Sequence, residues 1–325
     1  MPQPSQYDVH VNVPMTNISI AHAQDAENYI SSKIAPVVKV KKRSDKYYVF
    51  PKGQWFRNMV KERGESEESA GTGYSVQSNE SYYCKTYALH VDINDYTREN
   101  ADDPLDMDAD ASELLTDQML LSRDIQWAST QFKAGVWSVD ADVTQVGTGN
   151  GKWSAANSTP IEDLRKQITA FKKRNGRPPN KLVAGAEVWS ILQDHVEFLD
   201  RINGGATTGN PALFNQELLA RMLGLEDVIV AEAIQNDAVE GAADNFNFIC
   251  GKHALLLYVN PTPGLRKPSA TYTFVWDTFA AGPDGQKISK YRQDLKRSDR
   301  LEIETNYDFK VTGTDLGTFF PDVVA

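Results

Sequence analysis

The clearest pattern of apolar and polar positions along the chain lies between residues 153 and 260. Thr159 and Pro160 suit a helix start, because threonine can cap the first turn and proline needs no amide donor at the first helical position. The apolar residues that follow at spacings of three and four are Ile161, Leu164, Ile168 and Phe171. The pattern then predicts strands at 182–184 and 228–230 and helices at 188–199 and 211–223. Together these elements predict a compact α/β unit that folds by itself.

A period of two dominates residues 83–93 and predicts a half-buried strand. Further strands are predicted from Val38 and at 47–50, whereas residues 63–73 offer no hydrophobic residue to a core. This pattern indicates two strands joined by a long polar tip. Because isolated hairpins are marginal in water, we expect this hairpin to project and to lean on a neighbour.

Three further stretches have distinct patterns. Residues 111–134 predict a helix of about 36 Å, with one near-heptad stripe. The residues of that stripe are Leu114, Leu121, Ile125, Ala128 and Phe132. Residues 301–312 alternate and predict a long strand with one core face and one wet face. Residues 1–36 are polar and weakly patterned, which is typical of an arm that gains order by contact.

Composition narrows the class of protein. The 325 residues are 41% hydrophobic and 24% charged, as expected for a soluble protein, and no apolar run approaches the ~18 residues of a membrane span. A net charge of −10 argues against a dedicated nucleic-acid binder. Residues 1–6 lack the features of a secretory signal, and Cys84 and Cys250 make no disulfide framework. We therefore expect a protein that stays in a reducing compartment.

No stretch of the sequence predicts an enzyme, cofactor or metal site. The glycine-rich segment 146–152 is not a phosphate loop, because Val146 replaces its first glycine and Trp153 its magnesium-binding hydroxyl. Cys250 and His253 have no second pair of zinc ligands, and the acidic runs lack the glycine and distal glutamate of a calcium loop. There is no Gly-x-Ser-x-Gly elbow. Because the chain is rich in carboxylates, a soluble α/β hydrolase with an unrecognised carboxylate pair stays open as an alternative of another class.

The order of the parts carries a resemblance to a known family. A polar arm, a projecting two-stranded loop and a long helix precede the α/β unit, and long strands follow it. The stretches that carry the likeness are 180–189, 195–202, 219–230, 252–258, 290–292, 297–299 and 306–311. In this combination the chain resembles the major capsid proteins of tailed phages, with the Hong Kong 97-type shell fold. The likeness extends from about residue 37 to the C-terminus.

The resemblance implies an α+β fold with named parts. Residues 1–36 would be the N-terminal arm and 37–98 the extended β-hairpin loop. Residues 99–152, with the long spine helix, would begin the peripheral domain, and 261–325 would complete it with long strands. Residues 153–260 would form the α/β axial domain around the centre of each hexamer or pentamer.

The resemblance also implies a role and partners. The chain would be a non-enzymatic structural protein of the virion capsid, assembled in the host cytoplasm into hexamers and pentamers of an icosahedral head. That head would enclose double-stranded DNA through non-specific contacts. A portal, decoration proteins and a separate scaffolding protein are expected partners, since no long charged helical segment precedes the arm; otherwise a scaffold segment is missing from the sequence. A compartment shell of the encapsulin type is the alternative within the same fold.

Charge then suggests which residues meet between subunits. The loop is basic from residue 39 to residue 63, whereas residues 65–110 are acidic and end in the run 102–110. Single surface ion pairs contribute only ~0–1 kcal/mol, but many repeated pairs add up over a shell. In the family the loop lies across a neighbouring subunit near its long helix. The candidate inter-subunit contacts are therefore Arg57, Lys61 and Arg63 of one chain with Asp102, Asp103 and Asp106 of the next.

Overall fold

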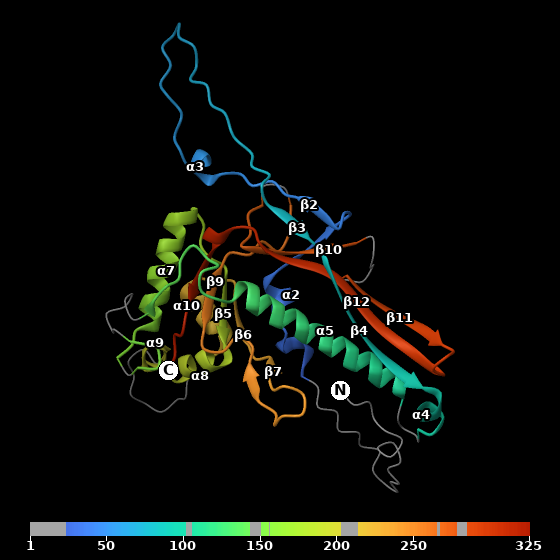
Figure 1. Cartoon of the computed structure of the whole chain (residues 1–325). Helices are drawn as coiled ribbons and strands as arrows, with labels where there is room; N and C mark the ends of the chain where they lie inside the picture. Colours follow the sequence, from blue (N-terminus) through green and yellow to red (C-terminus); the bar gives the residue numbers. More distant parts are fainter. Residues whose placement is uncertain are drawn as a thin grey trace.

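The computed structural model describes residues 24–101, 106–143, 151–155, 157–202, 214–264, 267–277 and 285–325. Within these residues, one four-stranded and one five-stranded sheet form two bodies that are connected by the long helix α5 (Figure 1). The chain is a mixture of helices and strands, as the sequence predicts. In the described part of the chain, every helix is too short or too polar to cross a membrane.

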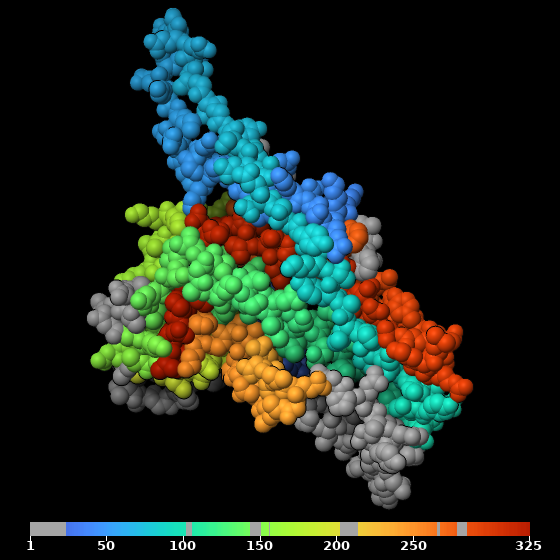
Figure 2. Space-filling model, in the orientation of Figure 1, coloured from blue at the N-terminus to red at the C-terminus, as the bar shows by residue number. Residues whose placement is uncertain are grey.

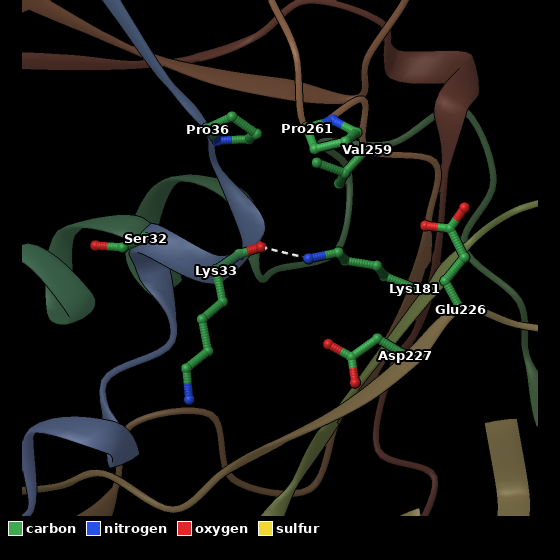
Figure 3. A pocket seen from close by; sticks show the side chains of 8 residues that line it. All are labelled: Ser32, Lys33, Pro36, Lys181, Glu226, Asp227, Val259 and Pro261. Carbon is green, nitrogen blue, oxygen red and sulfur yellow. Dashed lines mark hydrogen bonds between the residues drawn. The ribbon is translucent and has the colours of Figure 1, made fainter. Parts of the chain in front are cut away.

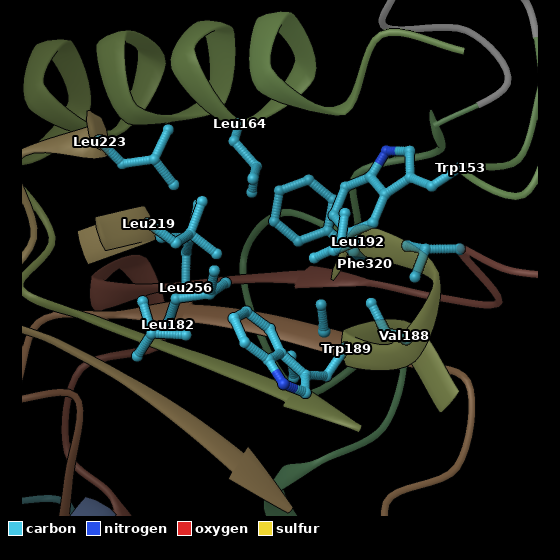
Figure 4. Close-up of a cluster of buried hydrophobic side chains, with 14 of the residues drawn as sticks. Trp153, Leu164, Leu182, Val188, Trp189, Leu192, Leu219, Leu223, Leu256 and Phe320 are labelled. Atoms are coloured by element: carbon cyan, nitrogen blue, oxygen red, sulfur yellow. The ribbon is translucent and has the colours of Figure 1, made fainter. Parts of the chain in front are cut away.

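The first body, called the axial body after the domain that the resemblance implies, is built on the four-stranded sheet, with the strand order β13-β9-β5-β6. Its strands are β5 (Lys181–Gly185), β6 (Asp227–Ala231), β9 (Ala254–Leu257) and β13 (Gly317–Phe320). Its helices are α7 (Pro160–Asn175), α8 (Ala186–Asp194), α9 (Val196–Ile202) and α10 (Gln216–Leu223). Leu182, Leu219 and Trp189 belong to one buried cluster between the helices and one face of the sheet (Figure 4). This body has the α/β core that the apolar pattern predicts.

The ends of the axial helices differ in detail from the prediction. α7 begins at Pro160 and ends before Gly176, whose φ of 68° suits glycine. The predicted Thr159 cap is wrong, because its side chain makes no capping hydrogen bond and the Glu197 carboxylate accepts the Ile161 N–H instead, at 3.0 Å. The predicted helix start at residue 211 lies outside the described residues. α10 begins at Gln216.

The predicted helix at 188–199 is two helices. α8 ends at Asp194, and His195 has an extended backbone with φ −73° and ψ 129°. The Glu197 N–H then donates to His195 Nδ1 at 3.2 Å. This local hydrogen bond competes with helix continuation, and α9 starts at Val196.

The C-terminal residues belong to the axial body. β13 pairs with β9, and Phe320, Val323 and Val324 lie in the axial core. The Trp153 N–H also donates to the Val323 carbonyl at 2.7 Å. The resemblance implies that residues 261–325 lie entirely with the peripheral strands, which does not hold for β13. The apolar pattern could not reveal this return, because a short apolar strand carries no mark of which sheet it will join.

The opposite face of the axial sheet is covered by the N-terminal segment and by the end of α5. Two short helices, η1 (Ala26–Asn28) and α2 (Ser31–Ile34), precede the first strand. Ile30 and Ile34 are buried with Trp127 of α5. Ile30, Ile34 and Ala35 thus gain their order by contact, as expected of the arm, but with their own chain and partly as a short helix rather than an extended segment. Residues 1–23 lie outside the described part of the chain.

The five-stranded sheet forms the second body, called the peripheral body after the domain that the resemblance implies. Its strands are β1 (Val37–Val40), β4 (Lys85–Asn94), β10 (Thr271–Trp276), β11 (Gln286–Gln293) and β12 (Ser298–Val311). β12 pairs with β4, β10 and β11, so this long strand is the centre of the sheet. As predicted, Leu301, Ile303 and Tyr307 are buried on one face. The short helix α4 (Asp95–Glu99) lies between β4 and α5, and η2 (Thr314–Leu316) lies between β12 and β13.

The helix α5 (Met107–Gln131) confirms the predicted spine helix, and Ala128 and Phe132 of the predicted stripe are buried, but the buried face differs toward the start of the helix. Leu115 and Met119 pack against β12, whereas Leu114 of the predicted stripe is 48% exposed. Arg123 and Asp124 are also buried. A stripe chosen from apolar residues alone misses these two charged positions.

The projecting loop spans residues 41–84, because β1 and β4 on either side belong to the peripheral sheet. It contains β2 (Ser44–Lys46), β3 (Ser81–Tyr83) and α3 (Lys52–Trp55). The strand predicted at 47–50 is wrong, since only a single bridge joins Val49 to Gln77 there. Figures 1 and 2 show the loop standing clear of the body. A second, smaller hairpin consists of β7 (Ile234–Asn236) and β8 (Phe246–Phe248).

Candidate assembly surfaces

The projecting loop exposes large apolar side chains to solvent. Trp55, Phe56 and Val60 are 55%, 65% and 86% exposed, and Tyr74 on the returning limb is 66% exposed. Exposed apolar side chains that gather in this way mark an interaction site. Arg57, Lys61 and Arg63 are exposed on the same stretch. The loop therefore offers a mixed apolar and basic surface that its own subunit does not cover.

The base of the loop is fixed to the axial body. The Lys52 ammonium forms an ion pair with the Asp315 carboxylate, which lowers the pKa of Asp315. The Phe56 ring lies against Gly176, at the end of α7, where an added Cβ would come within 3.3 Å of the ring. These contacts give the loop a defined direction although its tip has no core.

The acidic candidates occupy a different part of the molecule. Asp102 and Asp103 lie outside the described residues. Asp106 caps α5, accepting hydrogen bonds from the N–H groups of Asp108 and Ala109 at 3.1 and 3.3 Å. α3 and the start of α5 lie at opposite ends of the molecule (Figure 1). The structure therefore does not bring Arg57, Lys61 and Arg63 to Asp106 within one chain.

A network of ion pairs holds the far end of the peripheral sheet. Asp299 accepts from Arg98 at 2.6 Å and from Arg292 at 3.0 Å, and Arg292 also pairs with Asp95 at 2.6 Å. The hydrogen bonds from Arg98 and Arg292 lower the pKa of Asp299 to about 2. Arg292 lies directly opposite Asp299 in the β11–β12 register, so sequence reasoning could find this pair only once the pairing of the strands was known.

A shallow pocket lies between α2 and the ends of β5 and β6 (Figure 3). The Lys181 ammonium donates to the Lys33 carbonyl at 2.6 Å, and burial lowers the pKa of Lys181. Glu226 and Asp227 line the same pocket, so both signs of charge are present. The Lys181–Lys33 hydrogen bond thus connects the axial sheet to the N-terminal segment. The mixed charges of the pocket lining favour no particular class of ligand. Among the described residues, no group of three or more His, Cys, Asp or Glu side chains could hold a metal ion.

Ser158 and His195 form a buried pair of the kind that hydrolases use, but here the histidine donates a hydrogen bond to the serine hydroxyl. Ser158 Oγ lies 2.9 Å from His195 Nε2. Because His195 Nδ1 accepts the Glu197 N–H, the neutral ring carries its proton on Nε2 and donates it to Ser158. The Ser158 hydroxyl can in turn donate to the Ala155 carbonyl at 2.7 Å. A base that already donates to the hydroxyl cannot take its proton, so this pair acts as a structural contact.

Comparisons with known proteins agree on one class. No family model matches the chain. In sequence, it is 25% identical over 249 residues to the major capsid protein of Burkholderia phage BcepMu, which covers 77% of this chain and 76% of that relative. In structure, it is similar to a phage-related protein from Bordetella bronchiseptica, with a TM-score of 0.68, 20% identity and coverage of 91% and 92%.

Two shells of different kinds share the fold. The capsid protein of the cyanophage P-SCSP1u gives a TM-score of 0.60 at 11% identity, covering 97% of this chain and 93% of that one. The SrpI encapsulin of Synechococcus elongatus gives 0.57 at 10% identity, covering 97% and 94%. The chain therefore has the Hong Kong 97-type fold of capsid and encapsulin shells, as its resemblance implies. Within that class, the relative in sequence is a phage major capsid protein, and phage capsids are among the structures that share the fold.

Proposed function

We propose that this chain is the repeating subunit of an icosahedral phage head, forming the hexamers and pentamers that enclose double-stranded DNA. The observation that carries the proposal is the loop at 41–84, which leaves the body with Trp55, Phe56 and Val60 exposed. A single chain gains nothing from such a surface, whereas a neighbour can bury it. The defined direction of the loop base suits a contact that is repeated at every subunit boundary.

The mechanism of assembly is geometric. The axial and peripheral bodies have extensive cores, so we expect them to move as rigid parts. The loop tip makes local contacts, such as the Ser75 N–H to Gln54 Oε1 hydrogen bond of 2.8 Å, and has no core of its own. Small changes in loop position then allow one sequence to fit both pentamers and hexamers.

The partners follow from this role. We expect a portal, decoration proteins and a separate scaffolding protein, with assembly in the host cytoplasm. Contacts with packaged DNA would be non-specific, because the net charge of −10 leaves only local basic patches for phosphate. An encapsulin-type compartment is the same-fold alternative, supported by the likeness to the SrpI encapsulin. The phage capsid relative in sequence favours the head.

The test is assembly of the purified chain, alone and co-expressed with the scaffolding protein of its phage. Sedimentation and electron microscopy should show closed particles of uniform size. Particles isolated from an infected host should protect double-stranded DNA from nuclease, whereas particles filled with a protein cargo would favour the compartment. A chain that stays monomeric in both preparations would overturn the proposal.

A further inference from the structure

The β7–β8 hairpin is acidic and exposes apolar side chains. Residues 231–248 contain no lysine or arginine. Their four acidic residues, all exposed, are Glu232, Asp237, Glu240 and Asp244. Val239 at the turn is 79% exposed, and Phe246 is 62% exposed. The hairpin thus has the same mixture of apolar and charged surface as the loop at 41–84, with the opposite sign.

Side-chain amides hold this exposed hairpin in one conformation. Asn236 Nδ2 donates to Asp244 at 2.8 Å, and Asn245 and Asn247 donate to the two carboxylate oxygens of Asp237 at 2.7 and 3.0 Å. The Gln24 side chain exchanges two hydrogen bonds with the Ile234 backbone, at 2.7 and 2.9 Å. Asparagine donors are neutral, so Asp237 and Asp244 keep their negative charge. A pre-ordered surface loses little conformational entropy when a partner binds.

The placement of the two surfaces suits a head-to-tail contact. Figures 1 and 2 show the loop leaving one side of the molecule and the β7–β8 hairpin leaving the opposite side. A heterologous interface needs two different complementary patches on one subunit, and it closes into a ring when the rotation allows. The loop and the hairpin are such a pair.

Charge favours the hairpin over the acidic run as the acceptor of the loop. Asp106 caps α5, and Asp108 pairs with Arg98 and Lys290, each at 2.9 Å. Part of that run is therefore neutralised inside its own subunit. The hairpin acids Asp237 and Asp244 instead accept from neutral amides.

We infer that the β7–β8 hairpin is the docking site for the basic limb, residues 55–63, of the extended loop of a second copy of this chain. Arg57, Lys61 and Arg63 face the hairpin carboxylates, while Val60 meets the apolar residues Val239 and Phe246. The inference rests on the proposed shell function and names the surface that receives the loop.

The test uses two charge reversals that each leave the amide network intact. The loop variant is Arg57→Glu with Lys61→Glu and Arg63→Glu. The hairpin variant is Glu232→Lys with Glu240→Lys. Each should keep the circular dichroism spectrum and melting temperature of the wild type. Each alone should raise the protein concentration at which particles first form by about tenfold or more, because the loop variant sets like charges against the hairpin and the hairpin variant removes the net negative charge of the hairpin.

Combining the loop variant with the hairpin variant shows whether the two surfaces contact each other directly or whether each substitution causes its own defect. All five substitutions in one chain should restore assembly. An equimolar mixture of the two variants should also give hexamers, since alternation around an even ring sets each substituted loop against a substituted hairpin and each wild-type loop against a wild-type hairpin. A pentamer cannot alternate completely, so the mixture should yield fewer closed shells than the five-substitution chain.

A matched control variant tests whether the acidic start of α5, rather than the β7–β8 hairpin, receives the loop. Asp110→Lys with Glu113→Lys makes the same change of charge at the exposed start of α5. It should neither block assembly nor rescue the loop variant. Rescue by this pair, normal particles from the hairpin variant, or failure of the five-substitution chain would each overturn the inference while wild-type particles still form. A wild-type chain that never assembles would instead overturn the proposed function, and this inference with it.

Discussion

Trp189 lies on the face of α8 that points into the axial core (Figure 4). Its ring stacks on Phe214 with centroids 5.5 Å apart, and only 7% of the residue is exposed. The periodicity of α8 predicts this inward position, because Val188 and Leu192 recur on the same face. The partner ring could not be predicted, since it comes from a segment 25 residues later in the chain.

We predict that Trp189→Ala lowers the free energy of unfolding by about 3–5 kcal/mol, from lost burial and from the cavity left behind. Denaturant unfolding followed by circular dichroism measures this change. Val196→Ala is the matched control, because Val196 is 62% exposed and should change stability by less than about 0.5 kcal/mol. Normal stability of the Trp189 variant would contradict the assigned core position.

Asp299 makes acid stability a second residue-scale prediction. Arg98 and Arg292 hold its pKa at about 2, below the ordinary 3.8. A carboxylate with a lowered pKa in the folded state stabilises the protein above its ordinary pKa. That contribution is lost as the pH falls from about 4 to about 2. Asp299→Asn should therefore lower the melting temperature at pH 6 and flatten its fall over this range.

Thermal melts between pH 6 and pH 2 measure the two slopes. Asp294→Asn serves as the control, since the Asp294 side chain is 92% exposed and lies 3.5 Å from Arg292. Its melts should follow those of the wild type. Parallel curves for the wild type and the Asp299 variant would show that the ion-pair network does not set the acid response.

At the scale of elements, β13 closes the axial sheet. It covers the edge of β9 and brings Phe320 and Val323 into the axial core, with Phe319 on the other face of the sheet. The sequence predicts that residues 153–260 fold alone. The structure shows instead that this segment lacks its fourth strand.

We predict that deleting residues 317–325 leaves the chain without a cooperative unfolding transition. The deletion exposes the β9 edge and removes four buried apolar side chains, namely Phe319, Phe320, Val323 and Val324. Calorimetry of the truncated chain measures the transition. Deleting Ala325 alone, which is exposed, should leave the melt unchanged. A cooperative melt of the longer deletion at the wild-type temperature would mean that the sheet is stable without β13.

At the scale of the whole molecule, folding and assembly depend on different parts of the chain. The axial and peripheral cores contain few residues of the loop beyond its base, where Tyr82 and Cys84 pack against Phe274 of β10. Residues 51–76 lie outside these clusters. The loop should therefore matter to the shell and hardly to the fold of the subunit.

We predict that replacing residues 51–76 with a short glycine–serine linker abolishes particles and changes subunit stability by about 1 kcal/mol or less. Sedimentation measures assembly, and thermal melting of the subunit measures stability. Replacing only the polar tip at 64–73, which has no large apolar residue, keeps the exposed limb and should keep assembly. Loss of the fold in the first variant would show that the loop supports its own subunit.

The sequence by itself determined the local elements and their order. Gly176 and Gly224 end helices because each adopts a positive φ, and the alternation along β12 separates its buried face from its wet one. These features depend on residues close together in the chain, so a single sequence reveals them. The same local signals, in order, gave the resemblance to phage capsid proteins.

Only the tertiary structure decided which distant segments meet. It joined β13 to β9, placed Ile30 and Ile34 beneath the axial sheet, and set Arg292 opposite Asp299. It also buried Asp124 in α5, where the carboxylate accepts the N–H groups of Ile30 and Ser31, both at 2.9 Å. From sequence alone, a carboxylate in a helix is expected to face solvent, because burial requires hydrogen-bond donors. The donors to Asp124 lie more than 90 residues away in the chain, so the sequence does not reveal them.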